Sequence, residues 1–203
     1  MKDTIFSFNE DEVDYLKELI NIGHGHCASV IAELLEEFVT LSVPKIELFN
    51  DDALKGFFER LQDIDQFYAL QAFWGTISGK TLLIIKNDSI ESLRKIFEED
   101  EIEDDDIILE LINIMNASLL SRIAMELDTD VSFDIPTTYI PEIESENTLA
   151  KNSNYNEAIL MSTMLNFKDI DVQIDMIILM RDEGISWVHN KIREKIDELL
   201  KWN

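Results

Sequence analysis

The sequence repeats one polar pattern at a constant spacing of 92 residues, and this repeat constrains the fold to two similar halves. The repeated residues are Asp14, Glu18, Asn21 and Pro44 in the first half, and Asp106, Glu110, Asn113 and Pro136 in the second. The segments 18–22 and 110–114 are identical, so apolar positions recur as well. Apolar repeats alone would indicate only a duplicated fold. The polar triplet Asp, Glu and Asn recurs at the same spacing in both halves, which indicates that two equivalent sites have been retained with the fold.

Hydrophobic periodicity predicts the order helix, strand, strand, strand, helix in each half. The first half should contain a helix over 10–38, a strand over 39–48, a short helix over 51–61, strands over 67–74 and 80–85, and a helix from Ser89 to 98. The second half should contain a helix over 106–125, a strand over 131–139, a loop over 141–154, strands over 157–167 and 172–180, and a helix over 186–201. Asn9 or Asp11 should cap the first helix, and Pro44 should lie at a bulge or a sheet edge. This order predicts a mixed α/β (α+β) fold, a pseudo-two-fold duplicated unit with an antiparallel sheet and two long exposed helices that carry the sites.

The size of the chain favours one shared core. Of its 203 residues, 46% are hydrophobic, which is enough for a packed interior. Each half alone would bury too little surface to be more than marginally stable. We therefore predict a single domain over residues 1–203, made of two repeats at about 10–98 and 102–203.

The chain carries a net charge of −25, with 42 acidic and 17 basic residues. Binding to nucleic acid depends on neutralising phosphates with Lys and Arg, so nucleic acid and anionic membranes are poor partners. No segment approaches the roughly 20 uninterrupted apolar residues of a membrane helix, and the N-terminus lacks the apolar region of a signal peptide. Cys27 is the single cysteine, which excludes an internal disulfide and fits a reducing compartment. We expect a cytoplasmic protein without membrane insertion.

Each polar triplet forms a narrow stripe, because positions i, i+4 and i+7 lie on one side of a helix. In the first helix the small residues Gly25, Ala28 and Ala32 continue this stripe. Unpaired carboxylates are costly to bury, so the stripes should face solvent. An isolated stripe of this kind is usually an ordinary solvated helix face. Because the same identities recur in register, we interpret both stripes as docking surfaces that no cleft encloses.

The residue types in the stripes exclude several chemistries. No Ser, Cys or Lys nucleophile stands beside a base, which argues against covalent catalysis. Asn21 and Asn113 occupy the place of the histidine in a Glu-x-x-His di-metal motif, so a metal site is not expected. His24 and His26 diverge by about 200° on a helix, and we expect partner contact or solvation for them instead of a shared ion.

The remaining chemistry is the positioning of a water molecule against an activated phosphoryl group. An Asn amide can accept a hydrogen bond from water and donate one to a phosphoryl oxygen. Phosphoryl transfer passes through a loose transition state in most analyses, so positioning matters more than a strong base. A neighbouring carboxylate can meanwhile pair with a lysine of the substrate.

The pattern Asp/Ser-x-x-x-Glu-x-x-Asn, followed after 22 residues by Pro, resembles the signature of the CheC/CheX/FliY family of response-regulator phosphatases. The run from Asn21 to His26 is also similar to the family segment Asn-Ile-Gly-x-Gly-Asn/His. CheX-like members carry one site, and FliY-like members add a C-terminal domain. Two sites in a chain of this length therefore resemble the CheC type.

The resemblance implies a chemotaxis phosphatase that hydrolyses the phosphoaspartate of a phosphorylated CheY-type response regulator. Glu18 and Glu110 would form salt bridges with a lysine of the regulator. Asn21 and Asn113 would enter its active site and orient the attacking water. The regulator would supply the metal ion, so the chain is expected to need no cofactor of its own.

The other motif residues would have lesser roles. By the same resemblance Asp14 and Asp106 support the docking, while Pro44 and Pro136 are structural, since proline has no backbone donor. The motif also departs from symmetry, because Gly23 and Gly25 become Met115 and Ala117 in the second half. We therefore expect the two helices to differ in shape and the two sites to differ in strength.

The family further implies a partner, the receptor deamidase CheD, which binds CheC and raises its activity. The polar segment Glu142 to Asn154 is a candidate contact because it interrupts the symmetry of the halves. A rival hypothesis is an adaptor that binds CheD and the regulator through the same residues without turnover. A flagellar-switch component is a weaker alternative.

Overall fold

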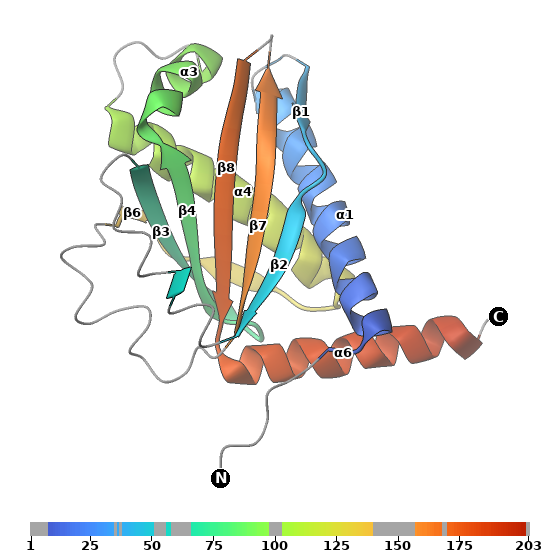
Figure 1. Cartoon of the computed structure of the whole chain (residues 1–203). Helices are drawn as coiled ribbons and strands as arrows, with labels where there is room; N and C mark the ends of the chain where they lie inside the picture. The colour runs from blue at the N-terminus through green and yellow to red at the C-terminus, as the bar shows by residue number, and fades with distance from the viewer. Residues whose placement is uncertain are drawn as a thin grey trace.

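Two long helices lie on one face of an eight-stranded antiparallel sheet in the described part of the chain (Figure 1). The computed structural model describes residues 8–34, 36, 38–50, 56–57, 66–97, 103–139, 157–167 and 170–201. The first half contains α1 (Glu10–Leu34), β1 (Val39–Leu41), β2 (Lys45–Asn50), β3 (Gln66–Gly75), β4 (Gly79–Lys86) and α3 (Asn87–Phe97). The second contains α4 (Asp104–Glu126), β5 (Val131–Phe133), β6 (Thr137–Thr138), β7 (Glu157–Phe167), β8 (Ile170–Met180) and α6 (Asp182–Lys201). The predicted mixed fold is confirmed.

The two halves exchange strands within this sheet. The order along the sheet is β1-β7-β8-β4-β3-β5, with β2 also paired to β7 and β6 also paired to β3. The first strands after α1 therefore pair with a hairpin of the second half, and the strands after α4 pair with a hairpin of the first half. Neither half builds its own part of the sheet alone. The predicted single domain over 1–203 and its repeat boundaries stay predictions, because residues 98–102 lie outside the described ranges.

Both predicted motif prolines lie at a bulge in an edge strand. Leu41 pairs with Leu165 and Lys45 pairs with Ser162. These pairs are four residues apart along the edge strand but three residues apart along β7. The same shift separates the pairings Phe133–Phe73 and Thr137–Leu70 in the second half. One extra residue on a strand defines a β-bulge, and a residue without an N–H is tolerated there. The expectation of a bulge or an edge for Pro44 is confirmed.

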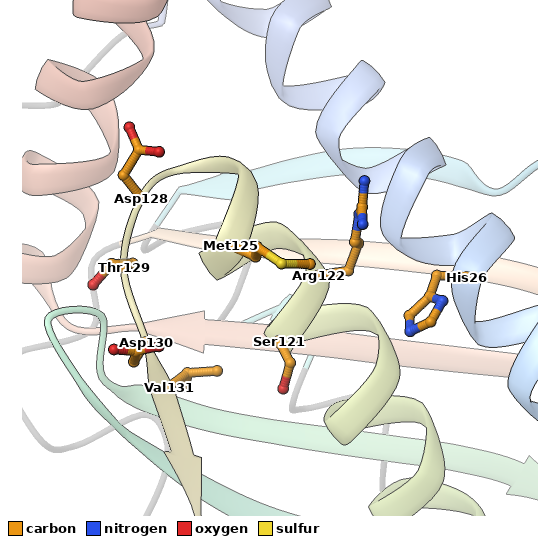
Figure 2. Close-up of a pocket in the computed structure, with 8 residues that line it drawn as sticks. All are labelled: His26, Ser121, Arg122, Met125, Asp128, Thr129, Asp130 and Val131. Atoms are coloured by element: carbon orange, nitrogen blue, oxygen red, sulfur yellow. The ribbon is translucent and has the colours of Figure 1, made fainter.

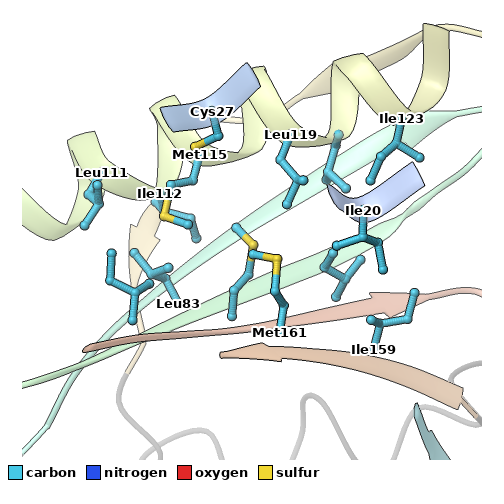
Figure 3. Packing of buried hydrophobic residues seen from close by; sticks show 14 of the residues in the cluster. Ile20, Cys27, Leu83, Leu111, Ile112, Met115, Leu119, Ile123, Ile159 and Met161 are labelled. Atoms are coloured by element: carbon cyan, nitrogen blue, oxygen red, sulfur yellow. The ribbon is translucent and has the colours of Figure 1, made fainter. Parts of the chain in front are cut away.

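The main hydrophobic core lies between α1, α4 and the covered face of the sheet (Figure 3). Leu111 and Leu119 of α4 meet Leu83 of β4 and Met161 of β7 there, and all four are fully buried. The alternating residues Leu82 and Ile84 of β4 belong to a smaller cluster on the opposite face. Both sheet faces are therefore apolar in the central strands, which explains their near-continuous hydrophobic sequences.

Helices α1 and α4 approach each other closely at Gly23. A Cβ atom at Gly23 would lie 2.8 Å from Leu119 Cδ1 and 2.9 Å from the Leu119 carbonyl oxygen. Gly25, two residues on, has nothing within 4 Å of the same position and is exposed. The small residues Gly25, Ala28 and Ala32 form a separate stripe along the same helix. Gly23, outside that stripe, admits the second helix, while Ala32 of the stripe packs partly against the core.

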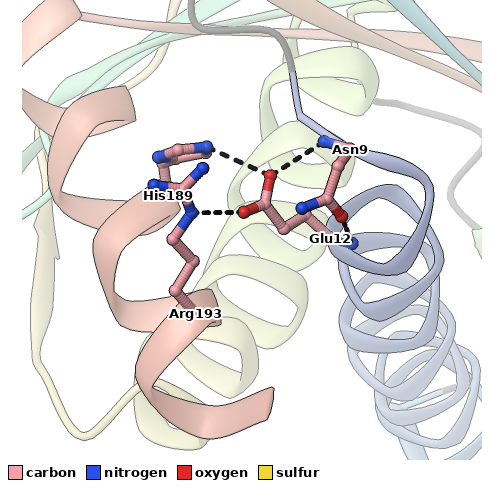
Figure 4. Close-up of polar contacts among 4 residues, drawn as sticks. All are labelled: Asn9, Glu12, His189 and Arg193. Carbon is pink, nitrogen blue, oxygen red and sulfur yellow. Dashed lines mark hydrogen bonds and ion pairs between the residues drawn. The ribbon is translucent and has the colours of Figure 1, made fainter. Parts of the chain in front are cut away.

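The N-terminus of α1 is attached to α6 through a buried carboxylate (Figure 4). The Glu12 side chain is 1% exposed, and its Oε2 accepts a hydrogen bond from the Asn9 N–H at 2.8 Å. The Asn9 Oδ1 accepts one from the Glu12 N–H at 2.9 Å, which completes a capping box and confirms Asn9 as the cap. His189 Nε2 lies 3.1 Å from Glu12 Oε2, and Arg193 Nε donates to Glu12 Oε1. The carboxylate thereby joins two helices distant in sequence.

The pKa of Glu12 reflects these contacts. Burial alone would raise the pKa, but the hydrogen bonds from Arg193 and the Asn9 amide, together with the electrostatic effect of the neighbouring His189 and Arg193, outweigh it. The pKa therefore lies below the ordinary value of a glutamate. The ionised form of Glu12 is the one that stabilises this junction.

Several predicted boundaries are wrong by a few residues. The first helix ends at Leu34 instead of 38, and Phe38 is exposed. The helix predicted from Ser89 begins at Asn87, and α6 begins at Asp182 instead of 186. The strands predicted over 39–48 and 131–139 are each two short strands on either side of a bulge. The predicted loop over 141–154 lies outside the described residues. Of the predicted short helix over 51–61, only residues 56–57 are described, and they are helical.

Helix α4 is unusually apolar for a helix that carries a polar motif. Among the described residues it alone is long and apolar enough to cross a membrane by length and composition. Within the fold, 67% of its most apolar segment is buried, as expected of a core helix. Packing between the sheet and α1 accounts for its composition.

The helix crossing yields a test with an internal control. Replacing Gly23 by Ala should lower the free energy of unfolding by about 1–3 kcal/mol, because the methyl group would force α4 away. Replacing the open Gly25 by Ala should raise it by about 0.5–1 kcal/mol, since Ala favours the helix. Urea unfolding of both variants measures the two changes. Equal effects at the two glycines would contradict the described crossing.

The Glu12 junction predicts a pH-dependent difference in stability. Replacing Glu12 by Gln should lower the free energy of unfolding at pH 7 by about 1.5–3 kcal/mol, because hydrogen bonds to a charged group are lost. The difference in unfolding free energy should begin to shrink below pH 4.5, the ordinary pKa of a glutamate. It should be lost as the pH falls through the lowered pKa of Glu12 in the folded protein, where the carboxylate becomes protonated. Denaturant titrations from pH 7 to pH 3 measure this. A difference independent of pH would contradict the ionised junction.

Candidate functional site

The structure places both predicted polar stripes on the surface. The exposed members are Asp14, Glu18 and Asn21 on α1, and Asp106, Glu110 and Asn113 on α4. On α4 the motif lies on a solvated face that continues through Ala117, Ser121 and Met125, while the opposite side of the helix is buried. The stripe on α1 lies within a broader exposed face. The two triplets occupy corresponding positions in the two halves.

The central residues of each stripe are free to meet a partner. In the described part of the chain, the side chains of Glu18 and Glu110 form no ion pair or hydrogen bond, and the side chain of Asn21 forms no hydrogen bond. Asp14 is different, because its carboxylate lies 3.3 Å from the Lys17 ammonium. A free exposed carboxylate can accept a lysine or arginine from another protein without losing an existing contact.

Beneath the first stripe a buried polar chain connects helix, strand and bulge. His24, one turn after Asn21, is 4% exposed, and its Nε2 lies 3.0 Å from Thr163 Oγ1 of β7. Thr163 Oγ1 donates to the Ser42 carbonyl at 2.9 Å. Burial lowers the pKa of His24 to about 4, so the ring is neutral at pH 7. The expectation of solvation or partner contact for His24 is wrong, although His26 is exposed.

Beneath the second stripe the corresponding positions form an equivalent chain. The fully buried Asn116 donates from Nδ2 to Gln71 Oε1 of β3 at 2.6 Å. Gln71 Nε2 donates to the Asp134 carbonyl at 2.8 Å and to Asn113 Oδ1 at 3.0 Å. Asn116 and His24 are related by the 92-residue repeat, as are Gln71 and Thr163. Each site is therefore built from both halves, with a helix from one and a supporting strand from the other.

The bulges explain why backbone carbonyls are available to these chains. In a regular antiparallel ladder the carbonyl would bond to the neighbouring strand. The extra residue before each proline frees the Ser42 and Asp134 carbonyls to accept a side chain instead. The next residues, Val43 and Ile135, are 83% and 89% exposed. Each bulge thus supports its site from below and presents an aliphatic side chain beside it.

Sequence reasoning missed these four supporting residues, although a signal was present. Gln71 and Thr163 are buried polar residues within apolar strands, 92 positions apart. His24 and Asn116 are buried polar residues that follow the motif asparagines by three positions. A buried polar residue requires a partner, so repeated polar positions within core segments predict contacts between those segments.

A separate pocket of about 430 Å³ lies at the C-terminal end of α4 (Figure 2). Its lining residues are His26, Ser121, Arg122, Met125, Asp128, Thr129, Asp130 and Val131. Arg122 forms an ion pair with Glu126, and Asp128 with Lys191 and Lys195. Neither motif glutamate nor motif asparagine lines this pocket, so it is distinct from both stripes.

The exposed geometry favours contact with a macromolecule over enclosure of a small substrate. Cys27 lies in the core, and burial raises the pKa of its thiol to about 11, which makes it a poor nucleophile. The functional groups accessible in the stripes are carboxylates and amides. These groups can bind a cation and position a water or phosphoryl oxygen, provided that the partner supplies the reacting group.

Comparisons with known proteins agree in sequence and in fold. No protein-family model matches the chain. A segment of 49 residues is 43% identical to the CheY-P phosphatase CheC of Bacillus subtilis, and this match spans 24% of the chain and 23% of that relative. FliY from Thermotoga maritima has a TM-score of 0.64 at 14% identity, covering 94% of this chain and 100% of the FliY chain. The FliM middle domain from Vibrio alginolyticus has a TM-score of 0.63 at 10% identity, covering 87% and 99%.

At such low identities the likeness to FliY and FliM establishes the fold alone. The sequence match to a CheC adds evidence of kinship over its 49 residues. Both findings agree with the resemblance that the duplicated motif carries: the match to CheC agrees in sequence over its 49 residues, and the likeness to FliY and FliM agrees in fold.

Proposed function

We propose that this chain is a chemotaxis phosphatase that hydrolyses the phosphoaspartate of a phosphorylated CheY-type response regulator. The observation that carries the proposal is the pair of exposed Glu–Asn stripes at equivalent positions on α1 and α4, each supported by an equivalent buried chain. The kinship with a protein named as a CheY-P phosphatase supports the same activity. Fold alone would not, because one fold hosts many functions.

In this proposal Glu18 and Glu110 dock the regulator. Each free carboxylate forms a salt bridge with a lysine beside the regulator's phosphorylation site. Val43 and Ile135, the exposed residues of the two bulges, add aliphatic surface, and Asp14 and Asp106 extend the acidic stripe. The net charge of −25 also favours a partner surface with exposed lysines.

Asn21 and Asn113 carry out the positioning step. Once docked, each amide Oδ1 accepts a hydrogen bond from the attacking water, and Nδ2 donates to a phosphoryl oxygen. Water attacks phosphorus as the bond to the regulator's aspartate breaks, which releases inorganic phosphate and the free carboxylate. The metal ion that neutralises the phosphoryl charge belongs to the regulator, and the chain acts without a cofactor of its own.

The second candidate function is an adaptor that binds the regulator and CheD without turnover. The exposed stripes favour binding as much as catalysis, because docking and positioning use the same surface. We propose CheD as a partner in either case, on the family resemblance, and the cytoplasm as the site of action. The predicted CheD contact at Glu142 to Asn154 lies outside the described residues.

The catalytic role of the two amides is tested by removing both. Replacing Asn21 and Asn113 together by Ala should lower the rate of dephosphorylation by about 100-fold, equivalent to about 2.7 kcal/mol of barrier. Each single variant should keep partial activity if both sites work. Ser29 and Ser121, exposed and repeated on the same helices, provide the matched Ala control and should keep the rate. An unchanged rate in the double Asn variant would exclude the mechanism.

The docking role of the glutamates predicts an effect on binding affinity. Replacing Glu18 and Glu110 together by Gln should weaken binding of the activated regulator about tenfold and reduce its dependence on salt, because a charge pair is lost. Calorimetry with a regulator activated by beryllofluoride measures the affinity. Glu33→Gln, on an exposed part of α1 outside the stripe, serves as the control. Unchanged affinity in the double variant would refute docking through these carboxylates.

A further inference from the structure

The second stripe differs from the first in one contact. Asn113 Oδ1 accepts a hydrogen bond from Gln71 Nε2 at 3.0 Å. The side chain of Asn21, its counterpart, has no hydrogen-bond partner among the described residues. The residue equivalent to Gln71 is Thr163, whose hydroxyl is already engaged with His24 and the Ser42 carbonyl. A threonine side chain is also too short to extend past this chain toward the surface.

The orientation of the Gln71 amide follows from its surroundings. The Asp134 carbonyl can only accept, so the group that faces it must be the Nε2 donor. Oε1 of the same amide then faces Asn116 Nδ2, which donates to it at 2.6 Å. Because Gln71 presents a donor to Asn113, the atom of Asn113 that faces it must be Oδ1. The Asp134 carbonyl thereby determines the orientation of the Gln71 amide and, through it, of the Asn116 and Asn113 amides.

This chain has a direct consequence for the exposed Asn113. An unrestrained asparagine can rotate its terminal amide between two orientations that exchange oxygen and nitrogen. Gln71 favours the orientation that keeps Oδ1 at the protein surface and directs the Nδ2 donor away from Gln71. The carbonyl oxygen has a second lone pair and can still accept a hydrogen bond from water.

We propose that Gln71 is a positioning residue of the second-half site, which holds the Asn113 amide in the orientation that donates Nδ2–H to a phosphoryl oxygen, whereas Asn21 must be oriented by the bound regulator. This inference rests on the proposed phosphatase function and extends it to a residue on a strand of the opposite half. The two sites are therefore unequal for a physical reason. Orienting a side chain in advance removes an ordering cost from the reaction step.

The test transplants the first-half pair into the second half. Gln71→Thr combined with Asn116→His reproduces the His24–Thr163 pair and keeps a hydroxyl for the Asp134 carbonyl, but it removes the contact to Asn113. In an Asn21→Ala background, where only the second site operates, kcat should fall about 3- to 10-fold with KM unchanged. The same double substitution should leave kcat unchanged when Asn113 is already Ala. An equal fall in kcat in the Asn21→Ala and Asn113→Ala backgrounds would overturn the proposal. So would an unchanged kcat in the Asn21→Ala background.

A spectroscopic arm separates this inference from the proposed function. The side-chain amide of Asn113 should show more restricted picosecond-to-nanosecond motion than that of Asn21 in ¹⁵N relaxation of the unbound full chain. The transplant should make the two amides similar. Equal mobility before the transplant would refute positioning by Gln71 even if the phosphatase activity is established. If the Asn21/Asn113 double variant keeps its activity, the proposed phosphatase mechanism is refuted instead. The relaxation measurement then decides by itself whether Gln71 positions Asn113.

Discussion

The hydrogen bonds from Thr163 and Gln71 to the bulge carbonyls connect the features on which this structure depends. Each begins on a strand of one half and ends at a bulge that follows the helix of the other half. The strand exchange brings these groups together, and the prolines mark the places where the ladder is interrupted. A buried polar group without a partner would be costly, so these contacts also restrict the register of the edge strands. The exposed stripes are thus held by the core beneath them.

The sequence predicted the larger elements because their signals are local. Helical periodicity indicated α1 and α4, alternation indicated the β3–β4 and β7–β8 pairs, and the repeat predicted two equivalent halves. The exposure of Glu18 and Asn21 followed from their position opposite the apolar face. The strand exchange was not predictable, since it depends on which hairpin each edge strand meets. The burial of His24 escaped prediction for the same reason, because its partner Thr163 is 139 residues away.

The structure separates what solvation of the helix face explains in the polar motif from what it leaves unexplained. On α4 the motif lies on the solvated side of the helix, where polar residues at Asp106, Glu110 and Asn113 are expected of any solvated stripe. Solvation alone does not require an asparagine three residues after a glutamate on both helices. Nor does it require a buried polar residue three positions further on, bonded to a strand of the opposite half. The fold occurs in FliY and FliM as well, so the argument for phosphatase activity depends on the site and not on the architecture.

The central claim is that the chain turns over a phosphorylated regulator instead of merely binding it. Its most direct test follows loss of phosphoryl groups from a CheY-type protein with the chain at a small fraction of the regulator concentration, with and without CheD. The account predicts release of many phosphates per molecule of the chain, faster with CheD. Release that stops at one phosphate per molecule, or decay no faster than that of the regulator alone, would contradict it.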